Sequence, residues 1–331
     1  MAQVTGAFDT YEAVGNREEL AEAIYLITPE ETPLSTLIGR EPVKSVHPEW
    51  QTDVLATPGA NAVLEGNEWA FTEFAATARV GNYTQISEKV ISVTRTQDKT
   101  LKAGRKSELK RELQKKGKEL KRDMELALLS NKASVAGAAG TARQLGGFAA
   151  WLETNTNRGA TGTDGGFNSG TGIVDAAGAG TQRAFIKTQL DDVLMQTFVA
   201  GGNPTTVMLS PYAKTVFSGF SGIADLRSNQ GQGSKSQLTI FAGADMYVSD
   251  FGVLDVIPNR VMSYSTAVAS NVLVIDPDKA AVGIFDDIQM HEAAKTGDAE
   301  NRVLNVEYTL IMKNEAAHGV VADIFGVTSA S

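Results

Sequence analysis

The sequence contains no cysteine, so disulfide bonds, thiolate nucleophiles and zinc sites with cysteine ligands are all excluded. It has only three histidines, His47, His291 and His318, and they stand far apart along the chain. His291 opens a His-Glu-x-x-Lys segment, which lacks the second histidine of a zinc-peptidase motif. Because isolated histidines are more often structural or solvent-exposed than ligands, we expect no metal site.

Long apolar runs are also missing. No stretch reaches about 18 apolar residues, so we expect no membrane-spanning helix and no membrane partner. The first 15 residues lack the basic start and apolar centre of a signal peptide. What remains is a chain of 331 residues, 42% of them hydrophobic, which is enough for one large or two medium cores.

No motif for catalysis or cofactor binding is complete. Residues 231–236 resemble a phosphate-binding loop but lack its Gly-Lys-Ser tripeptide. Residues 170–175 lack the third glycine of the dinucleotide-binding fingerprint. Residues 219–222 are one residue short of a nucleophile elbow. We therefore predict no catalytic residue, no cofactor and no enzymatic activity.

Charge is distributed very unevenly along the chain. Residues 102–122 hold ten basic and three acidic side chains, whereas residues 1–40 hold seven acidic and two basic ones. With a total of −9, the 21-residue basic segment carries +7 and the rest of the chain carries −16. Such polarity suggests pairing between molecules or contact with a polyanion, with a solvated helix face as the alternative.

The first 100 residues predict one short helix followed by extended chain. Residues 16–28 show a helical apolar stripe before two prolines, and an acidic segment of this kind is either a domain edge or an arm that packs on a neighbouring molecule. The clearest strand covers residues 84–96. Residues 55–82 are too polar to be buried on both faces, so we read a long protruding hairpin, although an ordinary surface hairpin fits equally well.

A long amphipathic helix is predicted over residues 105–131, with Ser107 as its N-cap. Gly117 inside it has no explanation in the sequence beyond a bend or a close crossing. Ten glycines between residues 146 and 181 then predict a long irregular connection.

The remainder follows an α/β pattern. Helices are predicted over 185–200 and from Ser210-Pro211 to 217, with a polar loop over 224–238. Predicted short strands cover residues 205–209, 246–249, 254–257, 272–275 and 281–285. The last long strand, 303–312, alternates apolar and polar side chains, and residues 320–325 are expected to pair with it.

This order of elements resembles the major capsid (head) protein family of tailed double-stranded DNA bacteriophages. The opening GNREELAEAIYLITPEETPLSTLIGR (residues 15–40) and the closing segment from IDPDK to VVADI (residues 275–324) support the resemblance. It implies an α+β capsid fold with an N-terminal arm (1–40), an extended hairpin loop (about 50–83) and a spine helix (about 105–131). A peripheral domain (41–145 and 276–331) and an axial α/β domain (146–275) complete it.

The same resemblance implies a structural role. The chain would assemble through pentamers and hexamers into an icosahedral head shell around packaged double-stranded DNA, in the virion and, during assembly, in the host cytoplasm. Its partners would be copies of itself, a portal, a separate scaffold or decoration protein, and DNA bound without sequence preference. The alternatives are the shell of an encapsulin-like cellular nanocompartment, and an unrelated soluble enzyme or binding domain.

Two sets of side chains are the candidates for contacts between subunits. We expect the acidic arm to meet the basic helix of a neighbour, although contact of that helix with DNA on the inner wall is the rival reading. Two tryptophans of the hairpin loop are added as further contact candidates. The full set is Glu18, Glu19, Glu22, Glu30, Glu31, Lys110, Arg111, Lys115, Lys118, Trp50 and Trp69.

Overall fold

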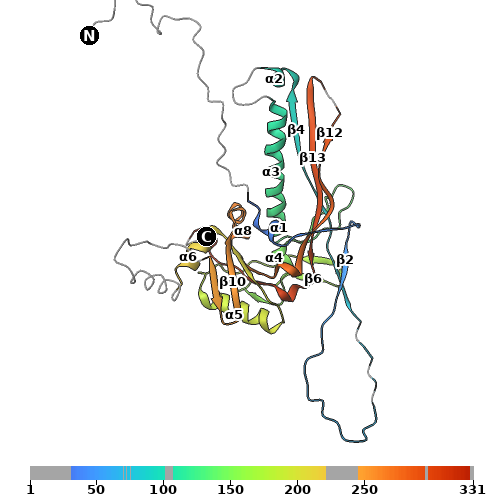
Figure 1. Cartoon of the computed structure of the whole chain (residues 1–331), viewed down its shortest axis with the longest axis vertical. Helices are drawn as coiled ribbons and strands as arrows, with labels where there is room; N and C mark the ends of the chain where they lie inside the picture. The colour runs from blue at the N-terminus through green and yellow to red at the C-terminus, as the bar shows by residue number, and fades with distance from the viewer. Residues whose placement is uncertain are drawn as a thin grey trace, which may run out of the picture.

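The computed structural model describes residues 31–69, 71, 73–74, 76–100, 107–220, 245–294 and 297–328. The helix expected over 16–28 and the polar loop expected over 224–238 lie outside them. Figure 1 shows a long helix beside long strands at one end of the molecule, a second sheet with its own helices at the other, and a narrow hairpin that projects away from both.

The first sheet has four strands and carries the long helix α3 (Glu108–Leu129) on one face. In spatial order its strands are β1 (Arg40–Pro42), β12 (Ala280–Glu292), β13 (Ala299–Met312) and β4 (Gln85–Thr94). The predicted alternation in β13 is confirmed, because Leu304, Val306 and Tyr308 are buried while the residues between them are partly exposed. The sheet and the helix therefore share one apolar core.

Helix α3 begins where its cap was predicted. The Ser107 side chain accepts a hydrogen bond from the Lys110 backbone N–H, and Leu120 and Leu128 are fully buried on the inner stripe. At Gly117 a Cβ would meet nothing within 4 Å, so a close crossing does not explain this glycine. The strand predicted over 84–96 ends at Thr94, because its side chain accepts from the Gln97 N–H and starts the short helix α2 (Arg95–Lys99).

The second sheet has six strands, and all four strands predicted between residues 205 and 275 belong to it. Their spatial order is β5 (Thr156–Asn157), β14 (Gly319–Val321), β11 (Val272–Ile275), β8 (Thr206–Leu209), β10 (Gly252–Pro258) and β9 (Met246–Ser249). Helices α5 (Lys187–Val199) and α6 (Pro211–Ser218) pack on one face and close a second core. Ser210 caps α6 as predicted, since its side chain accepts from the Ala213 N–H.

The pairing predicted for the C-terminal strand is wrong. β14 pairs with β11 and β5 in the six-stranded sheet and not with β13. Both edges of β13 are already occupied, by β12 on one side and β4 on the other. The 3₁₀ turn η4 (Glu315–Ala317) redirects the chain into the other sheet.

The remaining elements are short. They are α1 (Pro33–Leu37), β2 (Glu49–Thr52), β3 (Ala78–Gly81), α4 (Phe148–Trp151), β6 (Gly166–Asn168), β7 (Ile173–Asp175), η2 (Arg260–Tyr264), α8 (Thr266–Ala269) and η3 (Pro277–Lys279). Part of the glycine-rich connection is tied to the C-terminal segment by Asp323. Its carboxylate accepts hydrogen bonds from the N–H groups of Gly159 and Gly180, at 3.0 and 2.9 Å. A Cβ at Gly180 would lie 2.8 Å from this carboxylate, so the close approach needs glycine.

Candidate assembly surfaces

The projecting hairpin is anchored to the body of the subunit at its base. Strands β2 and β3 pair there from Glu49–Gly81 to Thr52–Ala78. The Trp50 indole N–H donates to the Met312 carbonyl at 2.8 Å, and its ring stacks on Trp151 with centroids 5.6 Å apart. Trp50 therefore binds the hairpin to the body of its own subunit, and its expected role as an intersubunit contact stays a prediction.

Beyond this base, the described residues between 53 and 77 run far from both cores (Figure 1). The hydrophobic side chains of the segment lie in solvent. They are Val54, Leu55, Val63, Leu64, Trp69, Phe71 and Phe74, each at least 72% exposed. Exposed apolar surface on this scale marks an interaction site in native proteins. The sequence pattern indicated a polar loop, and it undervalued these residues because they are scattered rather than periodic.

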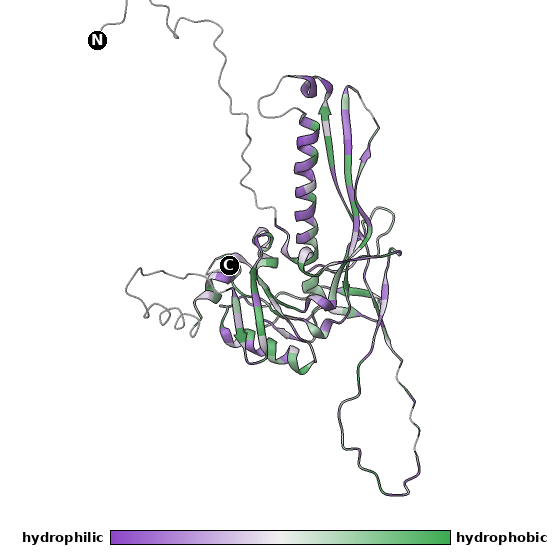
Figure 2. Ribbon diagram, viewed as in Figure 1, coloured by the Kyte–Doolittle hydropathy of each residue, from purple (hydrophilic) through white to green (hydrophobic). Residues whose placement is uncertain are grey.

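Figure 2 shows that α3 is hydrophilic along much of its length, and the predicted basic side chains belong to this helix. Lys110, Lys115 and Lys118 are exposed. Arg111 is engaged within its own helix, at 3.2 Å from Glu108 and 2.6 Å from Glu112. Of the four candidate residues on this helix, the three lysines are thus exposed, whereas Arg111 already has partners.

A further ion pair, between Lys116 and Glu119, neutralises part of this helix. The Lys116 ammonium donates to Glu119 at 2.7 Å, and this hydrogen bond lowers the pKa of Glu119 and raises the pKa of Lys116. Lys115 lies 4.0 Å from the same carboxylate. Seven of the ten basic residues of 102–122 belong to α3, and these ion pairs make the charge that the helix offers to a neighbour smaller than that count suggests.

Of the predicted arm, only the part from Glu31 onward lies within the described residues. Glu18, Glu19, Glu22 and Glu30 lie outside the described residues. Glu31 lies 3.9 Å from Arg260 of the same subunit, and both side chains are well exposed. An exposed pair of this kind contributes little stability, so it does not prevent Glu31 from meeting a neighbour.

A buried carboxylate, which the sequence analysis did not identify, holds the root of the arm. Glu125 of α3 is fully buried and accepts hydrogen bonds from the N–H groups of Leu34 and Ser35 at 2.6 and 2.9 Å. It also accepts from the Asn259 amide at 2.8 Å. One side chain thus joins α1, the spine helix and the chain that follows β10. Its sequence position among other helix glutamates gave no signal of this.

We expect Glu125→Gln to lower the free energy of unfolding of the unassembled subunit by about 1–3 kcal/mol, measured by urea denaturation. The amide has a single oxygen for three donors, and in either orientation its NH₂ would face one of the two backbone N–H groups. Glu119→Gln on the exposed side of the helix serves as the control and should cost no more than about 1 kcal/mol. Equal losses in the two variants would contradict the role assigned to Glu125.

The three histidines form no site. His47 stacks on Tyr83 with ring centroids 4.1 Å apart, His291 is exposed, and His318 is fully buried beside Phe148. Among the described residues, no three His, Cys, Asp or Glu side chains are grouped so that they could hold a metal ion. Nor does any helix in this part of the chain have the length and apolar character needed to cross a membrane.

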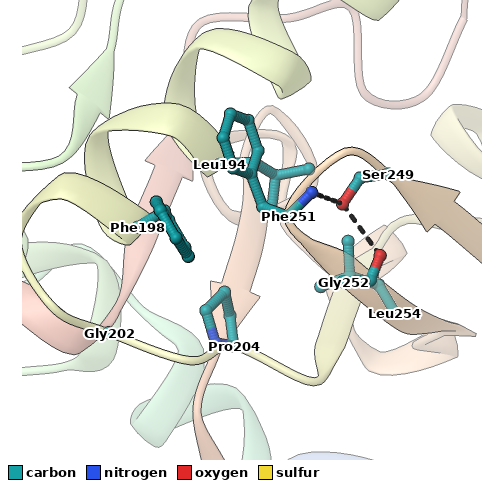
Figure 3. Close-up of a pocket in the computed structure, with 8 residues that line it drawn as sticks. All are labelled: Leu194, Phe198, Gly202, Pro204, Ser249, Phe251, Gly252 and Leu254. Carbon is teal, nitrogen blue, oxygen red and sulfur yellow. Dashed lines mark hydrogen bonds between the residues drawn. The ribbon is translucent and has the colours of Figure 1, made fainter.

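A small hollow lies between α5 and the turn that joins β9 to β10 (Figure 3). Leu194, Phe198, Pro204, Phe251 and Leu254 supply its apolar lining. Its volume of about 10 Å³ has room for roughly one water molecule, far less than a ligand-sized pocket. The surface around it is apolar, since the rings of Phe198 and Phe251 lie 5.1 Å apart and both are at least 38% exposed.

Comparison with known proteins agrees with this architecture. The chain is 27% identical over 366 residues to the major capsid protein of Escherichia phage Phieco32, and the match covers 98% of each. Among solved structures, the capsid of a native GTA particle matches with a TM-score of 0.59 at 11% identity and covers 97% of this chain and 99% of that one. The SrpI encapsulin of Synechococcus elongatus PCC 7942 matches at 0.55 and 10% identity, with 95% and 94% covered.

At these identities the two structures establish only the fold, which phage capsids and encapsulins share. The family comparison separates them, because the model of the SU10 major capsid protein matches residues 3–325, nearly the whole chain. The resemblance inferred from the order of elements is thereby confirmed, and the encapsulin alternative is less favoured. The chain belongs to the SU10 major capsid protein family, so it is a phage major capsid protein and a component of the virion.

Proposed function

We propose that this capsid protein assembles through pentamers and hexamers into an icosahedral shell around packaged double-stranded DNA, and that it has no catalytic role. The observation that carries the proposal is the hairpin, whose base is bound to the core while its far part exposes seven large apolar side chains. A loop of this kind adds contact area that a compact monomer lacks. Many weak contacts acting together then hold a closed shell.

The same proposal includes the division of the chain and its other partners. We assign residues 1–40 to the arm, 41–145 and 276–331 to a peripheral domain, and 146–275 to an axial domain. Strand β14 lies in the six-stranded sheet, so its residues are the exception within the peripheral segment. A portal, a separate scaffold or decoration protein, and non-specific DNA complete the proposed partners, with assembly in the host cytoplasm.

Electron microscopy of the expressed chain tests the proposal directly. We expect closed shells, tubes or rings of five and six subunits, alone or with the neighbouring phage genes co-expressed. A 35 kDa monomer at every protein and salt concentration, with and without those genes, would contradict it.

We further propose that the acidic arm pairs with the exposed lysines of α3 in a neighbouring subunit. Each exposed pair is worth less than about 1 kcal/mol, so only the whole set matters. The rival, contact of these lysines with DNA, is disfavoured by the charge of −16 on the rest of the chain.

Reversing Glu18, Glu19 and Glu22 to lysine should raise the protein concentration needed for assembly and weaken its dependence on salt. Light scattering against salt concentration measures both, and Asp278→Lys on the exposed turn η3 is the control. Unchanged assembly of the triple variant would remove the arm from this contact.

The composition of the hairpin loop also predicts that this loop forms no covalent crosslink between subunits. One member of the tailed-phage capsid family that this chain resembles crosslinks its subunits through a lysine of the corresponding loop. Between Trp50 and Tyr83 this sequence contains no lysine, so the loop has no side-chain amine for such a crosslink. Mature particles heated in SDS should therefore give a single band near 35 kDa. A ladder of larger bands would show this prediction to be wrong.

A further inference from the structure

In the part of the chain that the structure describes, the outer edge of β4 is an open edge of the four-stranded sheet. β4 is the outermost strand in the order β1-β12-β13-β4, and it pairs with β13 residue by residue from Gln85 to Thr94 without a register shift. It is ten residues long and contains neither proline nor a bulge. Native proteins usually protect such edges, because an open edge is a template for another strand.

Hydrogen bonds at both ends of β4 show which groups point outward. The Arg95 N–H donates toward β13, to the Asp298 carbonyl, at 3.1 Å. Alternate residues of an antiparallel strand bond to the same side, so the N–H groups of Ile86, Val90 and Ser92 face away from β13. The Thr84 N–H fits this assignment, since it donates to Val46 on the outer side at 2.9 Å.

Backbone pairing on the outer side of β4 therefore begins just before the strand and ends there. Asn82 and Thr84 donate to the carbonyls of Pro48 and Val46, and from Ile86 onward no described residue continues the pairing. A groove of about 460 Å³ lies beside this open stretch, with residues 90–94 as one wall. Glu108, Glu112 and Lys116 of α3 form the other wall. These residues follow one another at intervals of four positions, so they lie on one stripe of the helix.

The first described residues of the chain contact α3 on another side of the helix. Glu125 holds the root of the arm at Leu34, and at 3.6 residues per turn Glu125 lies about 180° around α3 from Lys116. The groove and the described contact of Leu34 with α3 therefore lie on opposite sides of this helix. Other copies of the chain are the neighbours that a capsid places around each subunit.

We propose that the open edge of β4 receives an extended segment from a second copy of this chain, which adds a fifth strand to the sheet between β4 and the Glu108–Glu112–Lys116 stripe. The inference rests on the proposed shell, because the shell brings the copies together. Backbone hydrogen bonds to Ile86, Val90 and Ser92 supply the affinity, as in other cases of strand addition. The polar stripe on α3 selects a segment with polar side chains on that face.

Hydrogen exchange compares the unassembled subunit with purified shells that contain only this chain. We expect the amides of Val90 and Ser92 to exchange at least about 100-fold more slowly in the shell, since a backbone hydrogen bond would then protect them. Equal exchange in the two states would overturn the proposal.

A pair of variants gives a second readout. Ser92→Pro removes the outward N–H without removing a bond to β13, whereas Ser92→Ala keeps it. The proline variant should need at least about ten times more protein to assemble while its subunit melts near the wild-type temperature, and the alanine variant should behave as wild type. Assembly of Ser92→Pro at the wild-type concentration would refute the added strand. If the wild-type chain formed no shell at all, the proposed function itself would fail, which is a distinguishable result.

Discussion

Trp50→Ala is expected to reduce the stability of the subunit, whereas Trp69→Ala is expected to reduce assembly, although both residues belong to the hairpin. Trp50→Ala should lower the free energy of unfolding of the unassembled subunit by about 2–3 kcal/mol, at or below the lower end of the range for a buried tryptophan, because the side chain is partly buried against the core. It loses the stacking on Trp151 and leaves the Met312 carbonyl without its donor. Urea denaturation of the subunit measures the loss.

Trp69→Ala should leave that free energy unchanged within about 0.5 kcal/mol, because the side chain is 84% exposed in the subunit. Its expected effect is on assembly. If Trp69 is a central contact in the shell, its truncation costs about 2 kcal/mol or more per contact, which corresponds to a concentration threshold raised about 30-fold.

Light scattering of the two proteins at increasing concentration gives this threshold, and Glu68→Ala on the same loop is the matched control. Normal assembly of Trp69→Ala would remove this residue from the interface. A stability loss as large as that of Trp50→Ala would show that the loop packs on its own subunit.

The second large effect concerns acid stability and His318. Burial lowers the pKa of this imidazole to about 4 from its ordinary 6.5, because the charged form would lose its hydration. Its Nδ1 accepts a hydrogen bond from the Asp276 N–H at 3.2 Å, and its Nε2 is buried with no hydrogen-bond partner. The fold therefore holds the ring neutral.

A depressed pKa in the folded state fixes the direction of the pH effect. Above pH 6.5 neither state binds the proton, and stability is complete. As the pH falls from 6.5 toward 4, the unfolded chain takes up a proton that the folded chain refuses, and about 3 kcal/mol of stability is lost.

Urea denaturation of the subunit from pH 7.5 to 4 measures this slope. His318→Asn retains an acceptor for the Asp276 N–H but does not titrate, so its stability should fall less steeply over the same range, whatever its absolute value. Parallel slopes for the two proteins would show that other groups control the acid response.

The features of the fold that the sequence predicted correctly are those set by residues close together along the chain. Ser107 starts α3 and Ser210 starts α6 because a cap bonds to an N–H group only three residues away. The alternation in β13 was visible because a strand with one buried face repeats every two residues. The order of the elements was sufficient to indicate the capsid fold.

The tertiary structure alone decided which partners those elements meet. Residues 319–321 have the composition of any buried strand, and they join β11 because β13 has no open edge left. Glu125 resembles its neighbours on the helix until α1 presents two N–H groups to it. In the same way, Trp50 and Trp69 are alike in sequence, and only the nearness of Met312, 262 residues away, makes one an anchor and leaves the other exposed. Local hydrogen bonds and periodicity are encoded within a few residues, whereas edges, buried charges and anchors depend on contacts that exist only after the chain has folded.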